Sequence, residues 1–142
     1  MNKNLSKKGF TIIELLVVIA IIAVLAAIVL VNVTQYIAKG KNSAIQGDMS
    51  TILTNAAVFY DQQTTATYVG FEATTGYTNP AADIAKNGGT ITAPAEVVDK
   101  FCVSTTMNVT NSEPTGTKYC VDSTGNKVKS VTTTCTSNAC VP

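Results

Sequence analysis

The chain has 142 residues, a formal net charge of +1 and an apolar content of 46%. This length suits one globular domain. It contains no His, Arg or Trp. Since His is the usual general base and metal ligand near neutral pH, and Arg the usual clamp for phosphate, these absences argue against an enzyme, a metal site and a cofactor site. A near-neutral charge also gives no electrostatic footprint for nucleic acid.

Residues 1–9 form a short polar leader. It carries Lys3, Lys7 and Lys8 and no acid, and it ends at Gly9. Lysines on this side of an apolar segment indicate a cytoplasmic N-terminus. Removing the leader would leave seven lysines and nine acids, a formal side-chain charge of −2.

An apolar run follows the leader, from Phe10 to Val33, and its single charge is Glu14. At about 1.5 Å of helical rise per residue the run reaches roughly 36 Å, enough to cross a bilayer core of about 30 Å. It has no small-x-small cleavage triplet of the kind that ends an ordinary secretory signal. We expect a helix over residues 10–33 that stays in the membrane.

Residues 7–15, which read KKGFTIIEL, resemble the prepilin processing motif of type IV pilins and type II secretion pseudopilins. The resemblance is most specific over residues 7–30. It implies that a prepilin peptidase cuts between Gly9 and Phe10 and methylates the new amino group of Phe10. It also implies a structural subunit that an inner-membrane platform assembles into a homo-oligomeric helical filament, which then lies outside the cell.

Glu14 is the residue with the sharpest functional expectation, because an acid inside a membrane-spanning segment is costly and usually functional. In one interpretation it complements the positive end of its own helix. In the other, which we favour, it meets the cationic amine of Phe10 in a neighbouring subunit and sets the register of assembly. That attraction is worth roughly 4 kcal/mol at 4 Å and an effective dielectric constant near 20.

Residues 34–62 continue the same helix in amphipathic form. Apolar residues recur there at helical spacing, namely Ile45, Met49, Ile52, Leu53, Ala56 and Tyr60. No Pro lies between Phe10 and Asp61, so the pattern predicts one helix of about 50 residues, near 75 Å long.

Residues 63–142 are predicted to form the head of an α+β, pilin-like fold. Turn signals dominate to residue 93, and we expect a connecting loop with a short helix over 80–86 and a further helical turn over 94–100. Strands are predicted over 101–105, 117–122 and 127–133, with residues 123–126 as a hairpin turn. One face of this antiparallel sheet should cover the apolar stripe of the helix.

The four cysteines, Cys102, Cys120, Cys135 and Cys140, all lie in this last third. An even number in an exported domain predicts disulfides. Three pairings are open, and we favour Cys102–Cys120 with Cys135–Cys140, because the first two lie in predicted strands and the last two are close in sequence. A four-thiolate zinc site is the rival interpretation, but the chain lacks the short C-x₂-C pairs typical of such sites.

Three further patterns have a plain and a functional interpretation. Tyr68, Phe71 and Tyr77 either pin a loop to the core, which is commoner, or form a sugar-binding or surface-binding group. Residues 122–126, DSTGN, form either a hairpin turn, which we favour, or a calcium loop. Residues 108–110, NVT, match a glycosylation acceptor, which would need an exposed loop.

Three functions remain in competition. The favoured one is a pilin that polymerises into an extracellular type IV filament for adhesion, motility or DNA uptake. The alternative is a pseudopilin of a type II secretion or competence machine. A membrane-anchored binding domain that never polymerises comes third, because it leaves the leader motif unexplained.

Overall fold

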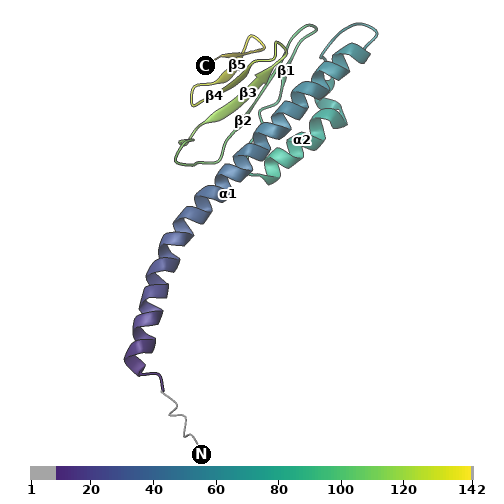
Figure 1. Cartoon of the computed structure of the whole chain (residues 1–142). Coiled ribbons are helices and arrows are strands. Elements are labelled where there is room, and N and C mark those ends of the chain that lie inside the picture. Colours follow the sequence, from purple (N-terminus) through teal and green to yellow (C-terminus); the bar gives the residue numbers. More distant parts are fainter. Residues whose placement is uncertain (1–8, 142) are drawn as a thin grey trace, which may run out of the picture. The chain divides into compact units, whose positions relative to one another are not determined.

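The computed structural model describes residues 9–141, with the side chain of Val31 left aside. The chain divides into two compact units at Thr34 and Gln35, and the long helix α1 (Ile12–Gln62) contributes to both. Figure 1 shows the second half of α1 beside α2 and the sheet of the head. The continuous helix confirms the sequence expectation, because no residue along it removes a backbone donor.

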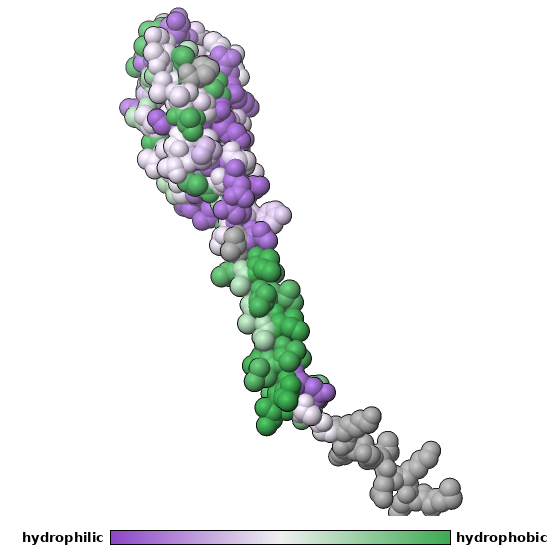
Figure 2. Space-filling model, turned by 90° about the vertical axis from the view of Figure 1, so that its left-hand side faces the viewer, coloured by the Kyte–Doolittle hydropathy of each residue, from purple (hydrophilic) through white to green (hydrophobic). Residues whose placement is uncertain are grey.

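In the N-terminal unit, the described apolar side chains of α1, which leave out Val31, are exposed on every side of the helix. Figure 2 shows this part of the helix as an almost uniformly hydrophobic surface. Among the described residues, α1 is the one helix that is long and apolar enough to cross a membrane.

The head combines the second half of α1 with a small antiparallel sheet. A short 3₁₀ turn, η1 (Phe71–Ala73), and a second helix, α2 (Thr75–Lys86), follow α1. Four strands then pair in the order β1 (Ala95–Glu96), β2 (Phe101–Thr106), β3 (Lys118–Asp122) and β4 (Lys127–Ser130), each antiparallel to the next. A separate hairpin joins β5 (Thr134–Thr136) to β6 (Ala139–Val141). The α+β, pilin-like fold class is thus confirmed.

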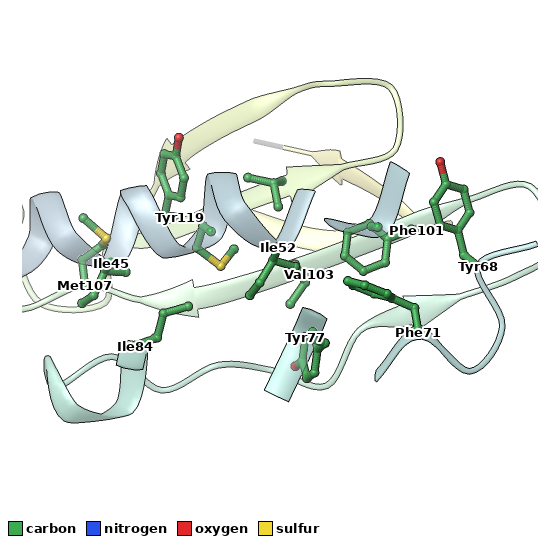
Figure 3. Packing of buried hydrophobic residues seen from close by; sticks show 13 residues of the cluster. Ile45, Ile52, Tyr68, Phe71, Tyr77, Ile84, Phe101, Val103, Met107 and Tyr119 are labelled. Atoms are coloured by element: carbon green, nitrogen blue, oxygen red, sulfur yellow. The ribbon is translucent and has the colours of Figure 1, made fainter. Parts of the chain in front are cut away.

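The main core of the head lies between α1 and one face of the sheet. From α1, Ile45, Met49, Ile52 and Ala56 are at most 1% exposed, as the apolar stripe predicted. Alternate residues of the strands meet them, and α2 adds Ile84 (Figure 3). The strand residues in this core are Phe101, Val103, Tyr119 and Val121.

Aromatic side chains close one end of this core. Phe71 lies 5.5 Å from Phe101 and 6.0 Å from Tyr77 between ring centroids, and Tyr68 lies 5.8 Å from Phe101. Figure 3 shows these rings gathered together. Because Tyr68, Phe71 and Tyr77 are at most 8% exposed, they pin the segment after α1 to the core, and they form no surface-binding group.

Helix α2 begins at Thr75, earlier than the predicted start at Pro80. Proline has no backbone N–H, so Pro80 cannot donate to the carbonyl of Gly76. The side-chain amide of Asn55, on α1, donates to that carbonyl instead at 2.8 Å. This substitute bond lets the helix run through the proline, and it required a tertiary partner that local sequence patterns do not reveal.

The helical turn expected over 94–100 is wrong. Residues 95–96 form the edge strand β1, where Ala95 pairs with Cys102 and Glu96 with Phe101. The Glu96 carboxylate accepts hydrogen bonds from the backbone N–H groups of Gly70 and Glu72 at 2.9 and 2.8 Å. The strand pairing and the contacts of the Glu96 carboxylate favour an extended backbone over residues 95–96.

The favoured disulfide pairing is also wrong: the bridges are Cys102–Cys135 and Cys120–Cys140, each with a Cα–Cα distance of 5.8 Å. Cys102 pairs with Asp122 in the sheet, so Cys120 is only its diagonal neighbour, and diagonal neighbours lie about 7–8 Å apart. Cys135 and Cys140 are directly opposite each other in the β5–β6 hairpin. Cys135 bonds Cys102 of β2 and Cys140 bonds Cys120 of β3, so the two bridges link the hairpin to the four-stranded sheet.

The β5–β6 hairpin itself was not predicted. Its turn consists of Ser137 and Asn138, which both have positive φ angles, 52° and 60°. Two such residues are the signature of a tight type I′ hairpin turn. The sequence signal for this hairpin turn was weak because Gly occupies neither of its two positions. The cysteines under this hairpin form a second small core with Val128.

Candidate assembly segment

The first turn of α1 is closed by a reciprocal pair of hydrogen bonds between Thr11 and Glu14. The backbone N–H of Glu14 donates to Thr11 Oγ1 at 3.2 Å. In return, Glu14 Oε2 accepts from the backbone N–H and the hydroxyl of Thr11, both at 2.8 Å. This is a capping box, which satisfies backbone donors that the helix leaves free at its start.

Glu14 therefore has a local role at its own helix end. Its other oxygen, Oε1, accepts no hydrogen bond from any residue in the described part of the chain. One carboxylate can accept several donors, so capping leaves room for a second, external partner. The sequence analysis missed Thr11, although T-x-x-E before an apolar run is a recognisable signal.

Glu14 stands alone in a fully apolar surface. The large apolar side chains between Ile12 and Leu30, with Val31 left aside, expose between 46% and 84% of their area. A soluble helix buries one stripe, whereas a helix that is apolar all round needs lipid or protein on every side. This segment can therefore insert into a bilayer or pack against copies of itself.

Gly9 and Phe10 precede the helix and are both exposed. A Cβ atom added at Gly9 would meet no heavy atom within 4 Å, and Gly9 is not among the glycines with a positive φ angle. Local folding therefore does not require glycine at this position. The leader residues 1–8, with Lys3, Lys7 and Lys8, lie outside the described residues.

Near Asn42, amide side chains join α1 to the loop over residues 107–117. Buried Asn42 accepts from the backbone and side-chain N–H groups of Asn108 at 2.8 and 3.0 Å, and it donates to the Asn108 carbonyl at 2.8 Å. Asn108 also donates to the carbonyl of Asn87 at 2.9 Å. The side chain of the glycosylation triplet's Asn is thus engaged in the fold, which argues against modification there.

The same loop contains a buried carboxylate, Glu113, which is 6% exposed. It accepts from the Thr110 hydroxyl, from Lys129 Nζ at 2.9 Å and from the Ser112 hydroxyl at 3.0 Å. The Thr110 hydrogen bond and the Lys129 ammonium lower the pKa of Glu113 to about 2, against the opposing effect of burial. Glu113 is a charged anchor between the loop and β4.

Asp122 occupies the turn that invited a calcium interpretation. Its carboxylate, fully buried, accepts from backbone and side-chain donors of Thr124 and Asn126 and from the backbone N–H of Cys140 at 2.9 Å. Burial opposes ionisation, but the hydrogen bonds outweigh it and lower the pKa of Asp122. These donors support the hairpin-turn interpretation.

Three of the four cysteines that could have bound zinc have their sulfur atoms close together. Those of Cys102, Cys120 and Cys140 lie within 4.8 Å of one another. All four cysteines, however, are in disulfides and so offer no thiolate ligand.

Comparison with known proteins places the strongest similarity near the N-terminus. Residues 4–30 match the family model described as the prokaryotic N-terminal methylation motif. Two curated proteins of Moraxella bovis, a type IV major alpha-pilin and fimbrial protein Q, are each 47% identical over 45 residues, which is 32% of this chain. The match covers 28% of the first and 29% of the second, and no solved structure matches the chain.

The methylation motif and the pilin relatives agree with the fold. A long N-terminal helix, a small antiparallel sheet and two disulfides accompany the motif in one chain. Type IV pilins are structural, non-enzymatic proteins. The prepilin motif and the apolar N-terminal helix together suggest a membrane-anchored precursor. The chain thus carries the N-terminal methylation motif and is similar to type IV pilins over 32% of its length.

Proposed function

We propose that this protein is a pilin subunit that polymerises through residues 10 to about 40 into a type IV pilus filament. The observation that carries the proposal is the apolar helical surface of the N-terminal unit, interrupted by the single carboxylate of Glu14. Before assembly this surface would be covered by lipid, and in the filament by the same helix of neighbouring subunits. Adhesion, surface motility or DNA uptake would then be properties of the polymer.

The subunit would first be inserted with its N-terminus in the cytoplasm and its head on the opposite side of the membrane. Prepilin peptidase would remove residues 1–9 by cutting after Gly9 and would methylate the amine of Phe10. An inner-membrane assembly platform would then extract it into the filament. Three features support this order: the lysine-rich leader, a glycine that local folding does not require, and a matched methylation motif.

In the filament, Glu14 would pair with the amine of Phe10 in a neighbouring subunit. Its Oε1, which accepts no hydrogen bond from residues 9–141, supports this role, because the carboxylate can keep its capping contacts with Thr11 and still accept a charged donor. The pair would select one axial register among the many that a smooth apolar helix allows.

Imaging of sheared cell-surface material, followed by mass spectrometry of its subunits, tests the function. We expect filaments that contain this chain beginning at Phe10. Short periplasmic assemblies alone would favour the pseudopilin alternative. A chain that stays monomeric in the membrane would contradict polymerisation and leave the anchored-domain alternative.

Cleavage is tested by Gly9→Val, which should block processing because a branched side chain replaces hydrogen next to the cut bond. Intact-mass measurement should show residues 1–9 retained in the variant and absent in the wild type. Val is free to adopt this backbone, since an added Cβ meets nothing within 4 Å. A fully processed Gly9→Val chain would refute the proposed cut site.

A further inference from the structure

The segment where α1 leaves its apolar run has a positive charge that the fold does not use. Between Asn32 and Gly47 the charged residues are Lys39 and Lys41, and the next acid is Asp48. Both lysines are exposed, and neither forms an ion pair with another residue in the described part of the chain. Tyr36 lies one turn before Lys39 and is 73% exposed. We call Tyr36, Lys39 and Lys41 the basic collar.

Helical geometry places Tyr36 at the level of lipid headgroups and the two lysines just beyond that level. At about 1.5 Å per residue, Tyr36 follows Val33 by about 4.5 Å, Lys39 by about 9 Å and Lys41 by about 12 Å along α1. The headgroup layer occupies roughly the first 5–8 Å outside the hydrocarbon. Side chains on a helix tilt toward its N-terminus, so the long lysine stems reach back toward the bilayer. Tyrosine is itself enriched at this interface.

The loop beside the collar carries no exposed negative charge. The loop over 107–117 lies next to this part of α1, where the backbone N–H of Asn111 donates to Gln35 Oε1 at 3.1 Å (Figure 1). The single acid of that loop is Glu113, which is buried and paired with Lys129. An anionic surface can therefore approach the collar without repulsion from the loop.

We propose that the basic collar binds the phosphates of anionic lipids on the side of the membrane that carries the head, and so holds the unassembled subunit at a fixed depth. Attraction of this kind is worth about 1 kcal/mol per lysine near an anionic surface, or about fivefold in occupancy. The proposal needs the membrane anchor but not the filament. Its failure would leave polymerisation untouched, and a monomeric subunit could still show the effect.

Residue-resolved acetylation of the full chain in lipid nanodiscs tests the proposal. Discs of phosphatidylcholine, with and without phosphatidylglycerol, are compared, and the rate at each lysine is read by peptide mass spectrometry. Lys39 and Lys41 should react about fivefold more slowly in the anionic discs, while exposed Lys100 on the head keeps its rate. Equal rates at the collar in both discs would overturn the proposal. Equal protection by inorganic phosphate added to neutral discs would also overturn it, because the ligand would then be a free anion.

A matched pair of variants supplies the control. Ser43 and Thr51 are both exposed on α1, and each donates to the carbonyl four residues before it. Ser43→Glu puts an acid one turn after Lys39, so the rate difference between the two discs should disappear at Lys39. Thr51→Glu adds the same charge two turns farther on and should leave the difference intact. A full difference at Lys39 in Ser43→Glu would show that its protection is not electrostatic.

Discussion

Single polar residues fix the positions of loops that apolar packing alone does not determine. Asn42 is the clearest case, because one side chain on the core-facing stripe of α1 makes three hydrogen bonds to Asn108. A polar residue on an apolar stripe reads from sequence as an interruption of the pattern. Its partner lies 66 residues away, so no local pattern could identify it.

Glu113 makes the stability of the head depend on pH. Its pKa is lowered from 4.5 to about 2 in the folded head, so the ionised form stabilises the fold. That stabilisation is complete above the unfolded pKa near 4.5 and is lost as the pH falls toward 2. The free energy of unfolding should therefore drop across this window. In Glu113→Gln the drop should be smaller, because the lost contribution is already missing at neutral pH.

Chemical denaturation of both proteins at a series of pH values measures this difference. Asp122 also has a lowered pKa, so both proteins should weaken in acid. The difference between the two curves isolates Glu113. Parallel curves from neutral pH to about pH 2 would show that Glu113 gains nothing from its ionised form in the fold.

At the scale of elements, α2 persists through Pro80 because α1 supplies the missing hydrogen bond. Asn55→Ala leaves the half-buried Gly76 carbonyl without this donor, and the loss of such a hydrogen bond costs about 0.5–1.5 kcal/mol of unfolding free energy. Pro80→Ala restores a backbone N–H at the position that can bond Gly76. In the double variant, Asn55→Ala should therefore cost less than it does alone.

A thermodynamic double-mutant cycle from urea unfolding checks this coupling. Asn42→Ala offers a comparison, because Asn42 is also an α1 amide but contacts the 107–117 loop, so its cost should be independent of Pro80. Additive effects of Asn55→Ala and Pro80→Ala would mean that the amide bond does not substitute for the helical one.

The elements differ in how well the sequence predicts them, and the difference is physical. The long helix and the strands β2, β3 and β4 follow from periodic patterns that are local. Strand β1, the early start of α2 and the disulfide pairing depend on contacts between distant segments, through Glu96, Asn55 and the hairpin over the sheet. In the candidate assembly segment, the motif points to Glu14 and to a cut site that stays a prediction, and the cap by Thr11 was equally local but overlooked.

The β5–β6 hairpin depends on its bridges more than any other element of the head. It adds three-residue strands and a small core of cysteines with Val128. Replacing Cys120 and Cys140 together by Ser should lower the unfolding free energy by about 2–4 kcal/mol, the usual contribution of a disulfide. Replacing Cys102 and Cys135 together should have an effect of similar size, measured by thermal unfolding.

A mixed pair of substitutions gives the control for the bridge assignment. Cys102→Ser with Cys120→Ser removes one partner from each bridge and should leave Cys135 and Cys140 to alkylate or to re-pair. Non-reducing peptide mapping distinguishes these species. An intact Cys135–Cys140 bridge in the wild-type protein would contradict the observed pairing.

At the scale of the whole molecule, the chain combines a stapled head with an N-terminal helix that buries nothing of its own. The two parts have opposite solvent requirements, since the head excludes water from its core while the apolar helix must be removed from water by lipid or by other subunits. The proposed polymerisation would resolve this conflict for every subunit at once. The remaining question is what selects the register between such smooth helices, and Glu14 is the one charged group available within them.

Two substitutions separate the two roles proposed for Glu14. Thr11→Val removes the hydroxyl contacts of the capping box, which should cost about 0.5–2 kcal/mol at the helix end but keep the charge. Glu14→Gln keeps the shape and an oxygen that can accept from Thr11, but it removes the charge that would attract a neighbouring amine. If pairing sets the register, filament yield at an equal membrane pool should fall steeply in Glu14→Gln and only modestly in Thr11→Val.

Quantifying subunits in sheared filaments against subunits in the membrane fraction gives the measurement, and disulfide mapping verifies that the head has folded in each variant. If capping alone matters, the order reverses, because glutamine still serves at the third position of a capping box while valine cannot accept from the Glu14 N–H. Wild-type yield from both variants would assign the register to helix packing alone. The two substitutions therefore distinguish charge pairing, capping and packing within one filament assay.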